Sequence, residues 1–410
     1  MSRIFKLKNH IKHYDWGSPD RIPQLLGADN RENVPWAELW MGIHPEGPSE
    51  TEYEGKPIAL SELIRRDPLR YLGAETGRYF GTLPFLFKLL AVGKPLSIQA
   101  HPTLAQAQAG FERENQEKIP FKAWNRNYKD PNHKPEILCA LQDFRAMGGF
   151  RESAEIALLL DRFARFAPPF LQASLTSLSR MLTGSQERSC RLRTFFKELF
   201  ALSPEIKHGL SACAKTCRDA LLNAYPEYTK EWETAAYCAE LYPGDAGVIA
   251  PLYLNVIDLR PRQAIYIPEG VLHAYISGFG VELMASSDNV LRGGLTSKHI
   301  DHEELLRILN FDPFNPAVLG LQESAYPTPC KEFALSVLTN QGDNLSFLKR
   351  GPAIVMVTQG KSAIDYKNGE EFCVLEPGES AFIPASDTPG AYTFSGDYTL
   401  YAAGVGDLSW

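Results

Sequence analysis

The sequence predicts a mainly β protein with a helical insert, arranged as two jelly-roll barrels and one all-α domain. Three observations support this fold class. Short apolar runs separated by turn residues occur towards both ends of the chain, a central stretch shows helical periodicity, and one segment of the β-rich part is repeated. A chain of 410 residues also exceeds what one ordinary hydrophobic core holds, so several domains are expected.

The first β-rich segment extends to about residue 150. It contains runs such as PFLFKLLAVGKPLSIQAHP, in which apolar stretches alternate with Gly and Pro turn signals. From 151 to 245 apolar side chains instead recur every three or four residues, as in EIALLLDRFARF, which indicates amphipathic helices. We therefore predict a discontinuous first barrel domain, 1–150 and 246–325, that is interrupted by a helical domain, 151–245.

An internal repeat indicates a second barrel. The segment LRPRQAIYIPEGVLHAY, which begins at Leu259, matches LEPGESAFIPASDTPGAY, which begins at Leu375, when one residue is inserted. Each copy predicts a strand, a tight turn and a second strand. The copies differ where His273 of the first is replaced by Pro389–Gly390 in the second. Residues 326–410 are therefore expected to form a degenerate barrel that has lost this histidine.

Charge and composition exclude several classes of function. A formal net charge of −7 argues against a nucleic-acid surface, which requires a basic stripe. No apolar run reaches membrane-spanning length and the N-terminus lacks the apolar core of a secretory signal, so a cytoplasmic monomer without membrane partners is expected. The seven cysteines are scattered without CxxC pairs, which favours buried thiols over disulfides or a sulfur-ligated zinc.

Four residues in three segments are candidate metal ligands. Gln99 and His101 are two positions apart, so on a strand both side chains point to the same face. Glu136 begins the apolar run ILCAL, where a buried carboxylate needs a partner, and His273 lies in the repeated strand. Two imidazoles, a carboxylate and an amide oxygen suit Zn²⁺, while Mn²⁺, Fe²⁺, Co²⁺ and Ni²⁺ stay chemically open. Each residue taken alone is more commonly structural.

These segments resemble the type I phosphomannose isomerases, which are zinc-dependent enzymes of the cupin fold. The resemblance rests on YDWGS, AELWMGIHPEGPS, LPFLFKLLAVGKPLSIQAHP, NYKDPNHKPEI, HAYISGFGVELMASSDNVLRGGLTSK and LEPGESAFIPA. It implies that the two barrels are cupins, that the first is catalytic, and that one zinc per chain is bound by Gln99, His101, Glu136 and His273. The implied reaction interconverts mannose 6-phosphate and fructose 6-phosphate, a step of GDP-mannose biosynthesis.

The resemblance also implies catalytic and substrate-binding residues. The family's catalytic arginine falls on Arg292 and the lysine of the same motif on Lys298, although Gly293 and Ser297 replace the family's usual Ala and Pro. An aldose–ketose isomerase needs cationic groups for the phosphate and for the developing enediolate. Arg292 suits the enediolate; Lys298, Lys134 and Ser97 suit the phosphate, with Lys88 as a further cation.

The residue that carries the proton stays open between His133 and Asp288, with Lys134 and Glu282 as further candidates. We expect Lys134 and the metal to lower the pKa of His133. Glu282 is also a substrate-binding candidate. Tyr275, two residues from His273, and Trp16 are expected to contact the sugar; core packing is the alternative for both.

Other functions remain compatible with the ligand set. A cupin that acts on another sugar phosphate, a cupin dioxygenase and a non-catalytic sugar-phosphate sensor could each use mixed nitrogen and oxygen ligands. The lysine and arginine cluster disfavours the dioxygenase, and Arg292 beside the ligands disfavours the sensor.

Overall fold

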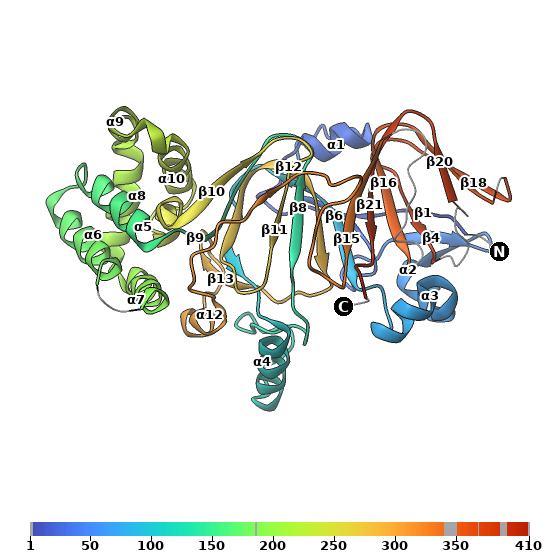
Figure 1. Ribbon diagram of the computed structural model, residues 1–410, viewed down its shortest axis with the longest axis horizontal. Coiled ribbons are helices and arrows are strands. Elements are labelled where there is room, and N and C mark those ends of the chain that lie inside the picture. The colour runs from blue at the N-terminus through green and yellow to red at the C-terminus, as the bar shows by residue number, and fades with distance from the viewer. Residues whose placement is uncertain (1–2, 185–186, 340–350, 368, 386–391, 409–410) are drawn as a thin grey trace.

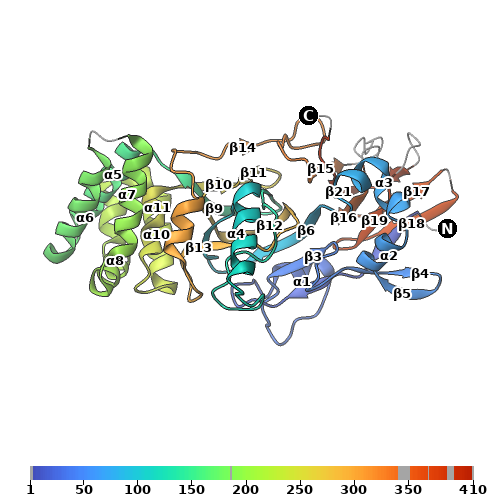
Figure 2. The ribbon, with the colours of Figure 1, turned by 90° about the horizontal axis from the view of Figure 1, so that it is seen from below.

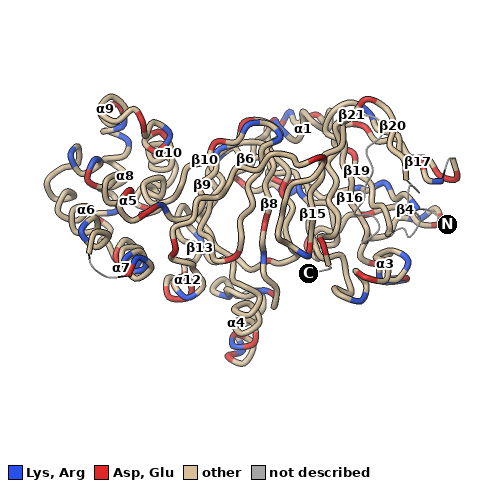
Figure 3. The backbone as a smooth tube through the Cα atoms, viewed as in Figure 1, with Lys and Arg blue, Asp and Glu red and all other residues tan. Residues whose placement is uncertain are grey.

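The computed structural model describes residues 3–184, 187–339, 351–367, 369–385 and 392–408. Figures 1 and 2 show an elongated molecule with a cluster of helices at one end, a β unit in the middle and a second β unit at the other end. Among the described helices, none combines the length and apolarity that crossing a bilayer requires. Basic and acidic residues are interspersed along the chain (Figure 3).

The helical domain consists of short antiparallel helices whose apolar stripes face one another, as the sequence periodicity predicts. Its core is continuous with the middle β unit, because Met147, Leu272 and Ile98 pack in the same apolar cluster as the helices. The helices and 3₁₀ turns of this region are α5 (Ser153–Ala164), α6 (Pro169–Leu182), α7 (Arg188–Ala201), α8 (Pro204–Thr216), α9 (Arg218–Ala224), η1 (Pro226–Tyr228), α10 (Thr229–Leu241), η2 (Ala246–Ile249) and α11 (Ala250–Tyr253).

The middle β unit is organised around one long strand, β12 (His273–Ala285). The second half of β12 lies in a sheet of order β14-β11-β8-β12-β6-β3-β2. The first half of β12 pairs with β9 and with β7. Strand β9 also pairs with β10, and β7 also pairs with β13. These strands are β2 (His10–Lys12), β3 (Glu38–Met41), β6 (Phe85–Val92), β7 (Ile98–Ala100), β8 (Glu136–Ala140), β9 (Phe144–Phe150), β10 (Leu254–Leu259), β11 (Ala264–Ile267), β13 (Leu291–Gly294) and β14 (Val318–Leu319).

The second β unit has one sheet of order β1-β19-β16-β21-β15 and a smaller sheet of order β18-β17-β20. The N-terminal strand β1 belongs to this unit, because it pairs with β19. Sequence patterns do not reveal that pairing. The strands are β1 (Phe5–Leu7), β15 (Ala334–Thr339), β16 (Ala353–Gly360), β17 (Ser362–Tyr366), β18 (Glu371–Leu375), β19 (Ser380–Ile383), β20 (Tyr392–Ser395) and β21 (Tyr398–Gly404).

The remaining elements lie around these sheets. A hairpin of β4 and β5 is followed directly by α2, and the capping box of α4 is formed by Thr103 and Gln106. The bounds are α1 (Arg21–Leu26), β4 (Glu50–Tyr53), β5 (Lys56–Ala59), α2 (Leu60–Arg66), α3 (Pro68–Tyr79), α4 (Leu104–Gln116) and α12 (His302–Ile308).

The two β units share one topology. The stretch β14-β11-β8-β12-β6 corresponds strand by strand to β1-β19-β16-β21-β15, and β10-β9 corresponds to β18-β17. The repeated turns agree in detail. Arg262 and Gly378 both have positive φ, 68° and 83°. The backbone N–H of Arg262 donates to Ala140 at 2.8 Å, as that of Gly378 donates to Val357 at 2.7 Å.

The strand, turn and strand expected of each repeat copy are therefore present. Pro389–Gly390, the predicted replacement of His273, lies outside the described residues. The strand pairings of the described residues do not close either unit into a complete barrel, so the observed architecture is a mixture of helices and open antiparallel sheets. The corresponding sheets of the two units pack face to face, with Cys139 and Val281 of one against Met356 and Tyr401 of the other.

Candidate active site

The candidate metal ligands lie where β7, β8 and β12 begin or end in the middle β unit. Gln99 is on β7, and Glu136 and His273 are the first residues of β8 and β12. His273 stands opposite Gln99 in the antiparallel pairing of β12 and β7. His101, Glu136 and His273 are buried, and their ligating atoms all lie within 4.8 Å of one another. The Gln99 amide nitrogen is 3.5 Å from Nε2 of His273, so this side chain also reaches the cluster.

Hydrogen bonds on the far side of each ring fix which nitrogen faces the cluster. Nδ1 of His101 donates to the backbone carbonyl of Asn289 at 2.7 Å, and Nδ1 of His273 donates to that of Val271 at 3.0 Å. A carbonyl oxygen only accepts, so each Nδ1 carries a proton and each Nε2 is left with a lone pair in the neutral ring. The structure thus orients both imidazoles as ligands.

The carboxylate completes an arrangement that requires a cation. Nε2 of His101 and Nε2 of His273 lie 3.4 Å and 3.3 Å from the two Glu136 oxygens. Burial and the nearby Lys134 ammonium lower the pKa of His101 to about 4, so this ring is neutral. Among the described residues, His101 Nε2 and Glu136 Oε2 lack a hydrogen-bond partner, and Glu136 Oε1 is contacted by the Lys134 ammonium. Lone pairs that face one another in a buried site repel, and a divalent cation between them removes the repulsion. The donor set therefore fits zinc.

Lys134 is committed to the ligand carboxylate. Its ammonium lies 2.8 Å from Oε1 of Glu136 as a buried ion pair. Burial alone would raise the pKa of the Glu136 carboxyl, but the Lys134 ammonium holds the pKa well below its usual range. Lys134 therefore keeps Glu136 ionised and leaves the phosphate to other cations.

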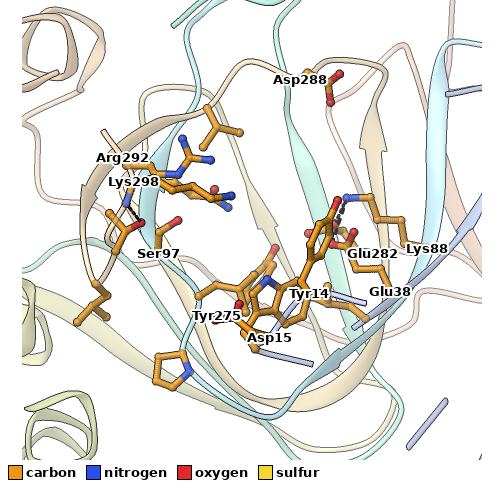
Figure 4. A pocket seen from close by; sticks show the side chains of 18 of the residues that line it. Tyr14, Asp15, Glu38, Lys88, Ser97, Tyr275, Glu282, Asp288, Arg292 and Lys298 are labelled. Atoms are coloured by element: carbon orange, nitrogen blue, oxygen red, sulfur yellow. Dashed lines mark hydrogen bonds and ion pairs between the residues drawn. The ribbon is translucent and has the colours of Figure 1, made fainter. Parts of the chain in front are cut away.

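A cavity of about 360 Å³ opens above this cluster. Figure 4 shows its lining: Arg292, Lys298 and Ser97 lie on one side, and Lys88, Glu282 and Glu38 lie on the other. The predicted residues that line the cavity are Trp16, Ser97, Gln99, Lys134, Glu136, Tyr275, Glu282, Asp288, Arg292 and Lys298. Residues scattered over more than 280 positions of the sequence are thus brought to one place.

One end of the cavity carries cations without partners. Among the described residues, neither Arg292 nor Lys298 forms an ion pair, although Lys88 and Lys134 do. Arg292 is therefore not paired with either of the nearby carboxylates, Asp288 and Glu282. Burial lowers the pKa of Arg292, and burial and Arg292 lower that of Lys298. Two adjacent cations without counter-ions are a site for a dianion.

The opposite side of the cavity holds a buried charge network. Lys88 lies 2.9 Å from Glu282 and 3.7 Å from Glu38, and all three side chains are at most 8% exposed. Burial alone would lower the pKa of Lys88, but the two carboxylates raise it, so the ammonium stays charged. Burial also raises the pKa of Glu282. The sequence analysis missed Glu38, whose signal was a charge within the apolar strand AELWMG.

Asp288 lies at the rim of the cavity and is paired with a histidine that the sequence analysis also missed. Nε2 of His44 is 2.9 Å and 3.0 Å from the two Asp288 oxygens, and its Nδ1 accepts the backbone N–H of Glu46. Burial alone would raise the pKa of Asp288, but the hydrogen bond from His44 lowers it. Asp288 is therefore ionised at neutral pH.

Two aromatic residues, Tyr275 and Trp16, line the cavity. Tyr275 is 1% exposed, and its hydroxyl lacks a hydrogen-bond partner among the described residues. Its ring centroid lies 6.0 Å from that of His273, so the two side chains share a face as their spacing predicts. Trp16 stacks on Tyr14 at 5.7 Å at the mouth of the cavity.

The structure places His133 away from this cavity. Its ring is bonded to Glu269 through Nδ1 and to Glu332 through Nε2, the latter at 2.8 Å. Burial alone would lower its pKa, but the two carboxylates raise it to about 9. The prediction of a lowered pKa is wrong, because neighbouring side chains of an extended segment point to opposite sides. Lys134 and Glu136 face the cavity, and His133 faces away from it.

Replacing His133 with glutamine is expected to reduce stability by about 2 kcal/mol at pH 7. A pKa raised from 6.5 to about 9 contributes stability in full below pH 6.5, and this contribution disappears as the pH rises through about 9. The melting temperature of the native protein should therefore approach that of the variant between pH 7 and pH 9.5. Thermal unfolding across this range checks the expectation; two parallel curves would contradict it.

Comparisons with known proteins point to one family. A family model described as phosphomannose isomerase type I, catalytic domain, matches residues 4–153. The mannose-6-phosphate isomerase of Escherichia coli (strain K12) is 38% identical over 395 residues, which cover 94% of this chain and 95% of that protein. The mannose-6-phosphate isomerase of Salmonella typhimurium (strain LT2) is 38% identical over 392 residues, with the same two coverages.

A solved structure points the same way. The chain resembles a crystal structure of mannose 6-phosphate isomerase in its zinc-bound holo form with a TM-score of 0.85 and 35% sequence identity. The similarity covers 98% of this chain and 100% of that chain.

Proposed function

Because this chain belongs to the type I phosphomannose isomerase family, we infer that it interconverts mannose 6-phosphate and fructose 6-phosphate with the help of bound zinc. One observation of its own residues carries the function. A buried set of nitrogen and oxygen lone pairs lies beside a cavity that Gln99 and Glu136 line, and Arg292 and Lys298, which form no ion pair with the described residues, line the same cavity. A metal site and a dianion site in one cavity suit a sugar phosphate.

We propose that the zinc is held by Gln99, His101, Glu136 and His273. When bound, the ion supplies a Lewis acid that polarises the carbonyl of the open-chain sugar and so lowers the barrier to proton removal from the neighbouring carbon. His101 and His273 are held in the required tautomer by backbone carbonyls, and Lys134 keeps Glu136 ionised. No thiolate takes part, in keeping with a catalytic rather than a structural role.

We assign the phosphate to Arg292, Lys298 and Ser97. Arg292 carries a fixed positive charge from β13, and Lys298 and Ser97 stand on adjoining loops (Figure 4). A sugar phosphate anchored at this end extends its carbonyl carbons towards the metal ligands. Arg292 lies opposite Gln99 in the antiparallel pairing of β13 with β7, so its guanidinium can also stabilise the negative charge that develops on the enediolate.

We assign the role of general base to Asp288. Asp288, whose pKa is lowered by His44, is ionised and can accept the proton that leaves carbon. Glu282, which forms a buried ion pair with Lys88 at 2.9 Å, is assigned to binding a sugar hydroxyl. His133 is withdrawn from this role because it does not line the cavity. Tyr275 and Trp16 are assigned to the sugar hydroxyls and ring.

We further propose that both β units are cupin barrels, the first catalytic and formed by 1–150 and 246–325, the second degenerate and formed by 326–410, with 151–245 as a helical domain. The common strand order of the two sheets supports this duplication, although β1 joins the second unit. A monomer and a cytoplasmic location are also proposed; the free thiols of the seven cysteines support the location.

A substrate panel tests the proposed function. Purified protein is expected to contain one zinc per chain and to convert mannose 6-phosphate to fructose 6-phosphate. Unphosphorylated mannose should react at least about a hundredfold more slowly in kcat/KM, because the two phosphate-binding cations then bind nothing. Equal turnover of glucose 6-phosphate would assign the site to another hexose phosphate, and iron content with oxygen consumption would indicate a dioxygenase.

A further inference from the structure

The helical domain touches both loops that carry the phosphate-binding side chains. One loop, residues 93–97, precedes β7 and ends at Ser97. The other, residues 295–298, follows β13 and ends at Lys298. Both loops line the cavity, and Tyr242, the residue that follows α10, lines it beside them. The wall at the phosphate end is thus built partly from the helical insert.

The first loop is anchored by tyrosines from the end of the helical domain. The Tyr242 hydroxyl donates to the backbone carbonyl of Pro95 at 2.7 Å, and the Tyr237 hydroxyl donates to that of Gly93 at 3.1 Å. Burial and Asp15 raise the pKa of Tyr242 to about 12, so its hydroxyl stays a donor. Pro95 is two residues from Ser97, so a shift of the Pro95 carbonyl moves the Ser97 hydroxyl.

The second loop is anchored by Asp245. Its Oδ1 accepts the backbone N–H of Gly247 at 2.7 Å, and its Oδ2 accepts that of Thr296 at 3.3 Å. The Thr296 hydroxyl in turn accepts the backbone N–H of Lys298 at 3.0 Å. A hydrogen-bonded chain therefore runs from the helical insert to the phosphate-binding lysine.

The backbone itself is closely packed at this junction. A Cβ atom at Gly294 would lie 3.0 Å from Oδ1 of Asp245 and 3.1 Å from the Cα of Gly247. Gly294 also has φ 131°, a conformation that residues with a side chain rarely adopt. Two segments that approach this closely leave the loop after β13 little freedom to shift.

The middle β unit also holds these loops, and these contacts limit the expected change in KM. The backbone N–H of Leu96 donates to the carbonyl of Tyr275 at 2.8 Å, and that of Gly93 donates to Trp16 at 2.9 Å. The loop of Ser97 therefore stays in place when one tyrosine hydroxyl is removed, but it is less rigid. For the Thr296–Lys298 segment, Asp245 is the side-chain anchor from outside its own loop.

We propose that Tyr242 and Asp245 are positioning residues that hold Ser97 and Lys298 in the geometry that binds the substrate phosphate, so that the helical domain is part of the substrate site. This inference rests on the proposed function for the identity of the anion. It assigns to the helical insert a role in affinity for phosphorylated substrate and no role in the chemical step.

The test uses the full-length, zinc-loaded protein with Tyr242→Phe, Asp245→Asn and the double variant. Each single change is expected to raise the KM for mannose 6-phosphate about fivefold and the double change more, with kcat within about twofold. The inhibition constant of inorganic phosphate should rise by the same factor. KM and this inhibition constant do not depend on the folded fraction, so partial unfolding cannot imitate the result.

Glu233→Gln is the matched control. It weakens a different contact of α10 with the β unit, the ion pair of Glu233 with Arg145 at 3.5 Å, and leaves both loops untouched. KM and phosphate inhibition should keep their native values in this variant. Unchanged KM and phosphate inhibition in Tyr242→Phe and Asp245→Asn would overturn the inference.

Phosphate binding also separates the inference from the proposed function. If the native protein binds inorganic phosphate in calorimetry but does not isomerise mannose 6-phosphate, the proposed function is wrong. Weaker phosphate binding in the two variants would then still support the positioning role.

Discussion

Replacing His273 with alanine is expected to abolish zinc binding and to lower kcat/KM for mannose 6-phosphate by at least about a thousandfold. His273 supplies one of the two imidazole nitrogens that face Glu136, at 3.3 Å from Oε2. Without His273, the remaining candidate ligands are one imidazole, the carboxylate and the Gln99 amide. These three groups are expected to bind zinc too weakly for the ion to stay bound during purification. Metal analysis of the purified variant and a coupled assay measure both effects.

The fold should survive this change. Glu136 keeps its ion pair with Lys134, so no unpaired charge is left in the core, and the apolar clusters of the helical domain and second β unit do not contain His273. Circular dichroism should match the native protein. His10→Ala, at an exposed histidine of β2, is the control and should keep zinc and activity. A His273→Ala protein that retains one zinc per chain would contradict the ligand assignment.

Replacing Lys88 with methionine is expected to reduce the free energy of unfolding by about 3–5 kcal/mol, because it leaves the buried carboxylates of Glu282 and Glu38 without a counter-ion. Their side chains are 5% and 8% exposed, so water cannot compensate for the lost ammonium. Equilibrium urea denaturation at pH 7 measures the difference. The loss should shrink at pH 5, where the unpaired carboxyl groups take up protons.

Two further variants isolate the cause. Adding Glu282→Gln to Lys88→Met should restore part of the stability, because the second change removes the unpaired charge. Lys361→Met breaks the pair of Lys361 with Glu376, in which both side chains are 62% exposed, and should cost less than about 1 kcal/mol. A loss for Lys88→Met as small as that for Lys361→Met would show that burial does not control the strength of these pairs.

The sequence predicted features that depend on local pattern. The turns at Arg262 and Gly378 were found because Leu-x-Pro marks both, and the helical insert was found because its apolar spacing is regular over many turns. The candidate metal ligands were predicted from chemical type and spacing together with the family resemblance, and the structure brings the ligating atoms of His101, Glu136 and His273 within 4.8 Å of one another.

The sequence did not predict the residues whose partners come from distant segments of the chain. His44 and Glu38 have partners, Asp288 and Lys88, that only the folded sheets bring near. The environment of His133 was misread because Glu269 and Glu332 are more than a hundred residues away in sequence, whereas Lys134 is adjacent but points elsewhere. Proximity along the chain does not indicate proximity in a sheet when side chains alternate between faces.

The pairing of β1 with β19 has a consequence for how the protein is made. Phe5 lies opposite Phe382, so almost the whole chain must leave the ribosome before the first strand finds its neighbour. At 5–20 residues per second, that strand waits roughly 20 to 75 s. Until then β1 lacks its neighbour in this sheet, and its unpaired backbone groups are a surface for pairing with other nascent chains. Strands from both ends of the described chain thus lie in one sheet.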